Sequence, residues 1–278
     1  MDFDKRITPM RLDLAAAHLK DQVNAAKFAE GRIAQVSRGV IGLHTAPTDG
    51  SPLRTQLLFG EEFTIYEEKH GWVWGQSMFD DYVGYARADA FAASAAPTHR
   101  VTALSTPLLN ATDVKKGARD MLPMNAKVTV AEEGGRFARL ANGCHVFAGH
   151  LAKIAARAPD WVSVAGQFVG VPYLWGGKTS AGLDCSGLVQ TALEAGGTKS
   201  PRDTDMMESA LGTALPLDAD LRRGDLIFWK GHIGLMLDPT RIIHANGYFM
   251  QVSVELLASV RDRTLAGENL PIRTIKRL

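Results

Sequence analysis

The sequence predicts an α+β protein in which two small β-barrels precede a domain of short helices and an antiparallel sheet. Short β-type runs separated by Gly, Pro and Asp fill residues 35–91 and return over 98–157. From residue 158 onward, helical patterns come first and strand patterns follow, which is an α+β arrangement. The chain has 278 residues, 46% hydrophobic and 22% charged, so it is long enough for two or three domains.

Residues 1–34 are expected to form a helical arm. Between residues 9 and 30, apolar residues recur at steps of three and four, and Gly31 ends the pattern; they are Leu12, Ala15, Ala16, Leu19, Val23, Ala26 and Ala29. We therefore predict a helix over 9–30 that packs on another domain.

The two barrels follow in tandem. In the first, over 35–91, Phe63 and Ile65 alternate with the residues beside them, as in a half-buried strand. The stretch "AASAAPT" is typical of a linker, and the second barrel is predicted over 98–157 from runs such as "HRVTALSTPLLNAT". We expect two barrels of similar plan.

The last domain, residues 158–278, is expected to begin with two helices. Asp160 is a good N-cap for a helix that runs to about Val169, and a second short helix is predicted over 186–195. The predicted strands lie in "GDLIFWK", "HIGLMLD", "RIIHANG", "QVSVEL" and "IRTIKRL".

The charge and the N-terminus limit the classes of function. A net charge of +1 gives no field that would attract nucleic acid or an anionic membrane. No stretch is long enough to span a membrane, and charges interrupt any secretory h-region: Asp2, Asp4, Arg11 and Asp13. A cytoplasmic protein with reduced cysteines is expected, unless a leader has been removed.

Cys185 stands at the predicted start of a helix, in "GLDCSGLVQ". Unpaired backbone N–H groups and the helix dipole favour an anion there, so we expect a lowered thiol pKa and a nucleophile. The alternative is a small buried apolar residue, the usual role of a cysteine.

Two histidines favour the nucleophile. His232 opens one predicted strand, His244 ends the next, and "DPTR" joins the strands as a hairpin. Adjacent antiparallel strands can place both imidazoles on one face, one as the base and the other as its orienting partner. Four other histidines are interpreted as structural: His18, His44, His70 and His99.

Cys144, His145 and His150 form a competing set, which would be a metal site. Zinc usually requires four ligands at characteristic spacings, and no second Cys/His pair is near. We expect no metal and no cofactor.

Four further stretches carry a resemblance. In order, "YLWGGKTSAGLDCSGLVQ", "RRGDLIFW", "GHIGLML" and "IIHANG" resemble the NlpC/P60 family of cysteine peptidases, over roughly 160–278. The resemblance implies a papain-like catalytic domain, and the preceding barrels resemble bacterial SH3-like domains. Such enzymes look like γ-D-glutamyl-L-diamino acid endopeptidases of the dipeptidyl-peptidase VI type, which cut cell-wall peptides with a free L-Ala-γ-D-Glu.

The resemblance also implies roles for individual residues. Cys185 would be the nucleophile, His232 the general base and acid, and His244 the orienting third residue. Five positions would line the site around the D-glutamate: Tyr173, Asp184, Ser186, Asp203 and Thr204. Thr204 stands where the family usually has serine, so its extra methyl group would narrow the pocket.

The first barrel is expected to contribute an acid and a tyrosine. "LLFGEEF" and "DYVGYA" resemble the family segments, which implies that Glu61 would hold the substrate ammonium and that Tyr82 would line the groove. Glu62 is an adjacent alternative for the acid, and both glutamates could instead be solvated charges at a strand edge.

The sequence therefore predicts hydrolysis of the γ-D-glutamyl–diamino acid bond in murein peptides, in a peptide-recycling role. Two alternatives remain open: barrels that attach the chain to intact peptidoglycan, and acyl transfer on a papain-like fold. The preferred diamino acid and the oligomeric state are not specified by the sequence.

Overall fold

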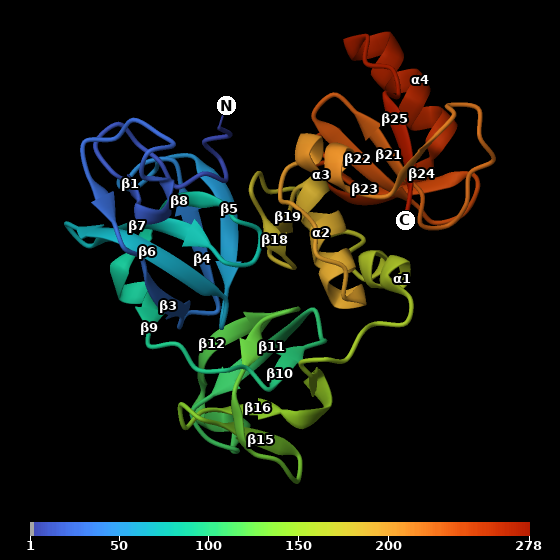
Figure 1. The fold of residues 1–278 in the computed structure, drawn as a ribbon. Coiled ribbons are helices and arrows are strands. Elements are labelled where there is room, and N and C mark those ends of the chain that lie inside the picture. The colour runs from blue at the N-terminus through green and yellow to red at the C-terminus, as the bar shows by residue number, and fades with distance from the viewer. Residues whose placement is uncertain (1–2) are drawn as a thin grey trace. The chain divides into compact units, whose positions relative to one another are not determined.

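The computed structural model of the protein describes residues 3–278 (Figure 1). The chain divides into two compact units, one ending at Ala156 and the other beginning at Arg157. This division falls beside the domain boundary expected at residue 158. Within residues 3–278, no helix combines the length and the apolar character that a membrane span requires.

A seven-stranded antiparallel sheet forms the first barrel, in the order β5-β4-β8-β7-β6-β3-β9. Phe63 and Ile65 of β6 are buried, whereas Glu62 and Thr64 lie on the more exposed face, as the alternation predicted. The inward residues share one core with Leu43, Leu57, Val73 and Tyr82, among others. The elements are β3 (Arg32–Val36), β4 (Val40–His44), β5 (Leu53–Leu58), β6 (Glu62–Lys69), β7 (Trp72–Ser77), β8 (Val83–Arg87), η2 (Ala88–Ala90) and β9 (Phe91–Ala92).

Two further antiparallel sheets, ordered β13-β10-β17 and β12-β11-β16-β15-β14, surround a second core. Val101, Leu108, Leu122, Val146 and their neighbours fill it, so the second predicted barrel has its own interior. The elements are β10 (His99–Val101), β11 (Ser105–Leu109), η3 (Val114–Lys116), β12 (Ala118–Pro123), β13 (Lys127–Val128), β14 (Val130–Glu132), β15 (Phe137–Leu140), β16 (His145–Phe147), η4 (Ala148–His150) and β17 (Leu151–Lys153).

The N-terminal arm is not helical, and the helix predicted over 9–30 is wrong. The arm consists of short pieces: β1 (Ala15–Ala16), η1 (Ala17–Leu19) and β2 (Phe28–Ala29), with β1 and β2 paired in parallel. Leu14 packs with Trp74 and Val83 of the first barrel, and the Val83 N–H donates to the Arg6 carbonyl. Ala15, Ala16 and Leu19 are buried but Leu12 is 86% exposed, so the apolar spacing does not mark one helical face, and contacts with the barrel override helix propensity. Residues 1–2 lie outside the described residues.

The second unit is built on a six-stranded antiparallel sheet in the order β20-β25-β21-β22-β23-β24. Helix α2 (Cys185–Gly196) packs against β22 and β23, and almost all of its residues are buried. A core on this sheet includes Trp229, Met236, Ile242 and Val260. The remaining elements are α1 (Trp161–Gly166), β18 (Lys178–Thr179), β19 (Gly182–Leu183), α3 (Thr204–Ala210), β20 (Thr213–Leu215), β21 (Leu226–Trp229), β22 (His232–Met236), β23 (Arg241–Asn246), β24 (Gln251–Leu256), α4 (Leu257–Glu268) and β25 (Thr274–Arg277).

The predicted elements of this unit are present, with differences at their ends. Asp160 caps α1 as predicted by accepting from the Ser163 N–H at 3.1 Å, but α1 ends at Gly166 rather than Val169. Helices α3 and α4 were not predicted. Helix α4 lacks a one-sided apolar stripe, the signal on which the sequence argument depends.

Candidate active site

Cys185 is the first residue of α2, at the helix N-terminus that the sequence predicted. The Asp184 carboxylate caps the helix by accepting the Gly187 N–H at 2.6 Å. The thiol is only 7% exposed. Its Sγ lies 3.7 Å from the Thr204 hydroxyl and accepts a hydrogen bond from the backbone of Ile233. The nucleophile candidate is therefore held between α2, α3 and the strand that carries His232.

The thiol pKa departs from the sequence expectation. Burial, followed by the nearby Asp184 carboxylate, raises the pKa of Cys185. The hydrogen bonds from Ile233 and Thr204 act in the opposite direction but do not outweigh desolvation. The thiol is therefore protonated near neutral pH, and a base must remove its proton before it can attack.

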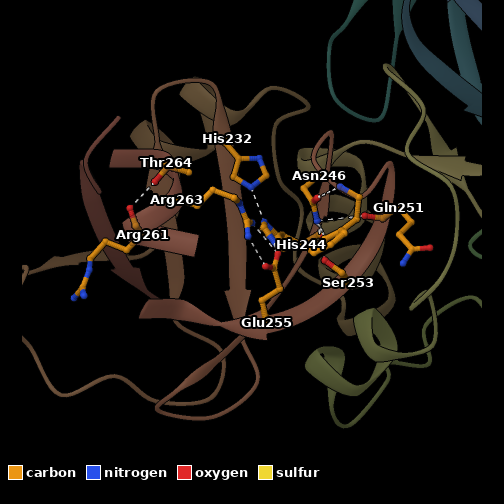
Figure 2. Close-up of polar contacts among 10 residues, drawn as sticks. His232, His244, Asn246, Gln251, Ser253, Glu255, Arg261, Arg263 and Thr264 are labelled. Carbon is orange, nitrogen blue, oxygen red and sulfur yellow. Dashed lines mark hydrogen bonds and ion pairs between the residues drawn. The ribbon is translucent and has the colours of Figure 1, made fainter. Parts of the chain in front are cut away.

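His232 and His244 come together because of the register of their strands. The pairing of Leu235 with Ile243 places Gly234 opposite His244, so His232 is the diagonal neighbour of His244 on the same face. His232 Nε2 lies 2.8 Å from His244 Nδ1 (Figure 2). The structure thus brings together the two histidines that the sequence singled out.

Both imidazoles are neutral near neutral pH. Desolvation, followed by the field of His244, lowers the pKa of His232 to about 3. Burial also lowers the pKa of His244, although the Glu255 carboxylate opposes this shift. The thiol is thus protonated and bonded to the backbone of the strand that begins with His232, and both imidazoles are neutral.

Two residues that the sequence argument missed lie behind His244. Glu255 Oε1 is 2.8 Å from His244 Nε2. Arg263 of α4 donates to both oxygens of Glu255, at 2.7 and 2.9 Å, and dashed lines in Figure 2 mark the contacts that link the four side chains. The signal was the alternation in "QVSVEL", which puts Gln251, Ser253 and Glu255 on one face of β24. It becomes informative only with the β23–β24 register.

The Asp184 carboxylate accepts hydrogen bonds from several groups of its own domain. Its oxygens accept from the backbone N–H of Gly176 at 2.8 Å and from the Ser186 hydroxyl at 3.2 Å. Arg202, itself 1% exposed, donates to both Asp184 oxygens at 2.9 and 2.7 Å and to the Ser186 hydroxyl at 2.7 Å. Asp184 and Ser186 therefore shape the start of α2, and their contact with a substrate stays a prediction.

Three other residues were expected near the D-glutamate, and the structure relates each of them to the thiol in a different way. Thr204 contacts Cys185 Sγ, and Asp203 directly precedes α3. Burial, and then the nearby Cys185 and Asp184, raise the pKa of Tyr173 to about 12, so its phenol is neutral and within electrostatic reach of the thiol. Their roles toward a substrate also stay predictions.

Glu61 and Tyr82 belong to the first unit. Glu61 is 1% exposed and accepts the Leu58 N–H at 2.9 Å, while the Tyr82 ring packs in the barrel core. The alternative acid, Glu62, bonds the Ser94 hydroxyl on the outside of the barrel. Glu61 is therefore not a solvated edge charge, and its proposed role in binding an amine stays a prediction.

The competing set around Cys144 has ordinary packing roles. Cys144 is buried in the second core, 3.8 Å from an Arg119 guanidinium nitrogen, and His150 Nδ1 contacts the Thr106 hydroxyl at 2.8 Å. Among residues 3–278, no group of three or more His, Cys, Asp or Glu residues could hold a metal ion.

A thiol at a helix tip that packs against the strand of a histidine pair is the arrangement of a cysteine peptidase site. The sequence matches the NlpC/P60 family over residues 170–265 and the bacterial dipeptidyl-peptidase Sh3 domain over residues 43–91. Residues 170–265 therefore form an NlpC/P60 cysteine peptidase domain, and the resemblance seen in the motifs is confirmed. The family match contains Cys185, His232 and His244.

Among curated proteins, the chain is 38% identical over 96 residues to the γ-D-glutamyl-L-lysine dipeptidyl-peptidase of Bacillus subtilis, covering 32% of either chain. It is 27% identical over 241 residues to the enzyme of the same name from Bacillus cereus, covering 71% of this chain and 68% of that one. A crystal structure of an NlpC/P60 family protein from Bacillus cereus has the same fold, with TM-score 0.74 and 20% identity over 88% of this chain and 99% of that one. The aligned part is thus about one third of the Bacillus subtilis relative.

Proposed function

We propose that the protein hydrolyses the γ-D-glutamyl–diamino acid bond of murein peptides that carry a free N-terminal L-Ala. The observation that carries this proposal is the Cys185–His232–His244 cluster in a domain preceded by a barrel that matches the dipeptidyl-peptidase Sh3 domain. The relatives named as γ-D-glutamyl-L-lysine dipeptidyl-peptidases support the choice of bond.

In the proposed reaction, His232 removes the Cys185 proton as the sulfur attacks the γ-carbonyl carbon of D-Glu. The oxyanion of the tetrahedral intermediate would accept the Cys185 backbone N–H at the start of α2. His232 then gives its proton to the amine of the diamino acid, which leaves as the C–N bond breaks and a thioester remains. Water, deprotonated by His232, hydrolyses the thioester and releases L-Ala-γ-D-Glu and the thiol.

Specificity for a free amine is assigned to the first barrel. Glu61, buried and positioned by the Leu58 N–H, would pair with the L-Ala ammonium. A peptide whose alanine nitrogen is acylated has no such charge, so stems attached to the glycan through that nitrogen would be excluded. This selectivity suits recycling of released peptides, and we place the enzyme in the cytoplasm on that ground.

The test uses two tripeptides, L-Ala-γ-D-Glu-meso-diaminopimelate and L-Ala-γ-D-Glu-L-Lys, each with and without an N-acetyl group. Mass spectrometry should detect L-Ala-γ-D-Glu from the free peptides only, and none with the Cys185→Ala variant. Release of peptides from intact sacculi at a comparable rate would contradict the proposal and favour a wall hydrolase. The ratio of rates on the two free peptides would identify the preferred diamino acid.

A further inference from the structure

A chain of contacts links four polar side chains of β22, β23, β24 and α4. His232 Nε2 meets His244 Nδ1 at 2.8 Å, and His244 Nε2 meets Glu255 Oε1 at 2.8 Å. Arg263 ends this chain of contacts by donating twice to Glu255. Its guanidinium carbon also lies 4.2 Å from the centre of the Tyr248 ring, a cation–π contact that helps to hold it.

The direction of each hydrogen bond in this chain of contacts can be deduced from its acidic end. An ionised carboxylate only accepts hydrogen bonds, so the proton of His244 must lie on Nε2. A neutral imidazole has one donor and one acceptor nitrogen, so His244 Nδ1 accepts, and His232 must donate from its Nε2. The Nδ1 of His232 is then left with a lone pair.

We propose that Glu255, clamped by Arg263, fixes the tautomers of both histidines so that His232 Nδ1 is the base for the Cys185 thiol. Glu255 touches neither the thiol nor a reacting atom, so it is a positioning residue that acts through His244. This inference rests on the proposed function as a cysteine peptidase but not on the identity of the peptide bond.

The same arrangement stabilises the charge that forms during the reaction. When His232 accepts the thiol proton, the positive charge on the histidine pair faces the Glu255 carboxylate across one hydrogen bond. Burial acts to raise the Glu255 pKa, but the hydrogen bonds and positive charges of Arg263 and His244 together lower it, so the carboxylate stays ionised. The other ionisable and charged groups near the pair and the thiol are Asp184, Tyr173 and Arg202.

The alternative is a purely structural role, in which the Glu255–Arg263 ion pair serves solely to attach α4 to β24. The two roles differ in what a variant changes. A structural role predicts loss of folded protein or of thermal stability, with normal kinetics per folded molecule. A positioning role predicts a lower kcat, an unchanged KM and a displaced pH profile.

Steady-state kinetics of the full chain on L-Ala-γ-D-Glu-diaminopimelate distinguish these roles. Glu255→Ala should lower kcat by roughly 10- to 100-fold, the usual cost of removing the partner behind a functional histidine. The acid limb of kcat/KM should move to lower pH, because a protonated histidine pair loses its counter-charge. Glu255→Gln keeps an acceptor and should retain more kcat, with a shift in the same direction. Arg261→Gln is the matched control, because Arg261 lies on the same helix in an exposed pair with Asp262. This variant should leave kcat and the pH profile unchanged.

Two readouts do not need the peptide. Nitrogen-15 NMR of labelled histidines should show His232 and His244 protonated at Nε2 in the wild-type protein, and a tautomer mixture in Glu255→Ala. In a Cys144→Ala background, iodoacetamide should alkylate Cys185 more slowly when Glu255 is replaced, since its base is misoriented. If both results were obtained but the wild-type protein did not hydrolyse the tripeptide, the proposed function would be overturned and the tautomer assignment would be supported.

Two results would overturn the inference. One is a wild-type spectrum with the His244 proton on Nδ1. The other is a folded Glu255 variant with the kcat, alkylation rate and pH profile of the wild type. Should Glu255→Ala not fold, Glu255→Gln and the wild-type spectrum decide the question.

Discussion

Replacing Arg202 tests how strongly the helix of the nucleophile depends on one buried ion pair. Arg202 is 1% exposed and donates to both oxygens of Asp184, whose side chain is 10% exposed, and to the Ser186 hydroxyl. Arg202→Ala leaves that carboxylate buried without its guanidinium, and breaking a buried pair in this way costs about 3–5 kcal/mol. Domains are commonly stable by about 5–15 kcal/mol, so the second unit should lose roughly a fifth or more of its free energy of unfolding.

Calorimetry of the full chain measures this effect. Each kcal/mol lowers the Tm of a domain of this size by about 3–5 °C, so the transition of the second unit should fall by about 10 °C or more. Arg223→Ala is the matched control. Arg223 pairs with Asp160 at the start of α1, but both side chains are more than 40% exposed, and such a pair contributes less than about 1 kcal/mol.

Arg202→Lys separates charge from geometry. Lysine retains the positive charge but cannot reach both Asp184 oxygens and the Ser186 hydroxyl with a planar fork. Its Tm should lie between those of the wild type and Arg202→Ala. Equal, small shifts for Arg202→Ala and Arg223→Ala would refute the reasoning and would imply that water replaces the guanidinium.

The remaining predictions concern catalysis and are read from kcat and KM on the free tripeptide. Cys185→Ala should abolish hydrolysis with the fold intact, whereas Cys144→Ala should keep nearly full activity; equal loss in both would contradict the assignment. His232→Ala should approach Cys185→Ala in severity, and His244→Ala should lose less, because water can partly replace an orienting residue but not the base. Since the His232 pKa is lowered to about 3 from an ordinary 6.5, activity should persist below pH 6.5, and stability should decline as pH falls from 6.5 toward 3. Glu61→Gln should lower kcat/KM by about 10- to 150-fold, the equivalent of roughly 1.5–3 kcal/mol, and should be non-additive with N-acetylation of the substrate; additive losses would place the ammonium elsewhere.

Local signals were sufficient to predict the start of α2 and the strands of the second unit. Asp184 before Cys185 is an N-cap pattern that depends only on neighbouring residues. The strand pattern around His232 and His244 identified two adjacent strands, whose short connection makes antiparallel pairing almost obligatory. The same kind of reasoning failed for the N-terminal arm, because residues such as Leu14 are buried by a barrel that follows much later in the chain.

Glu255 and Arg263 show where sequence reasoning reaches its limit in this active site. A glutamate on an alternating strand is ordinarily interpreted as solvent-exposed, and nothing near Glu255 in the sequence indicates otherwise. Its role depends on the pairing of Ile242 with Glu255, which makes it the diagonal neighbour of His244. It depends also on α4 turning Arg263 back onto that face, and α4 has no strong pattern of its own. The residue types that carry the chemistry could therefore be named from the sequence. The groups that set their protonation could not, because they meet only through tertiary register, and the histidine tautomers are the observable that would reveal them.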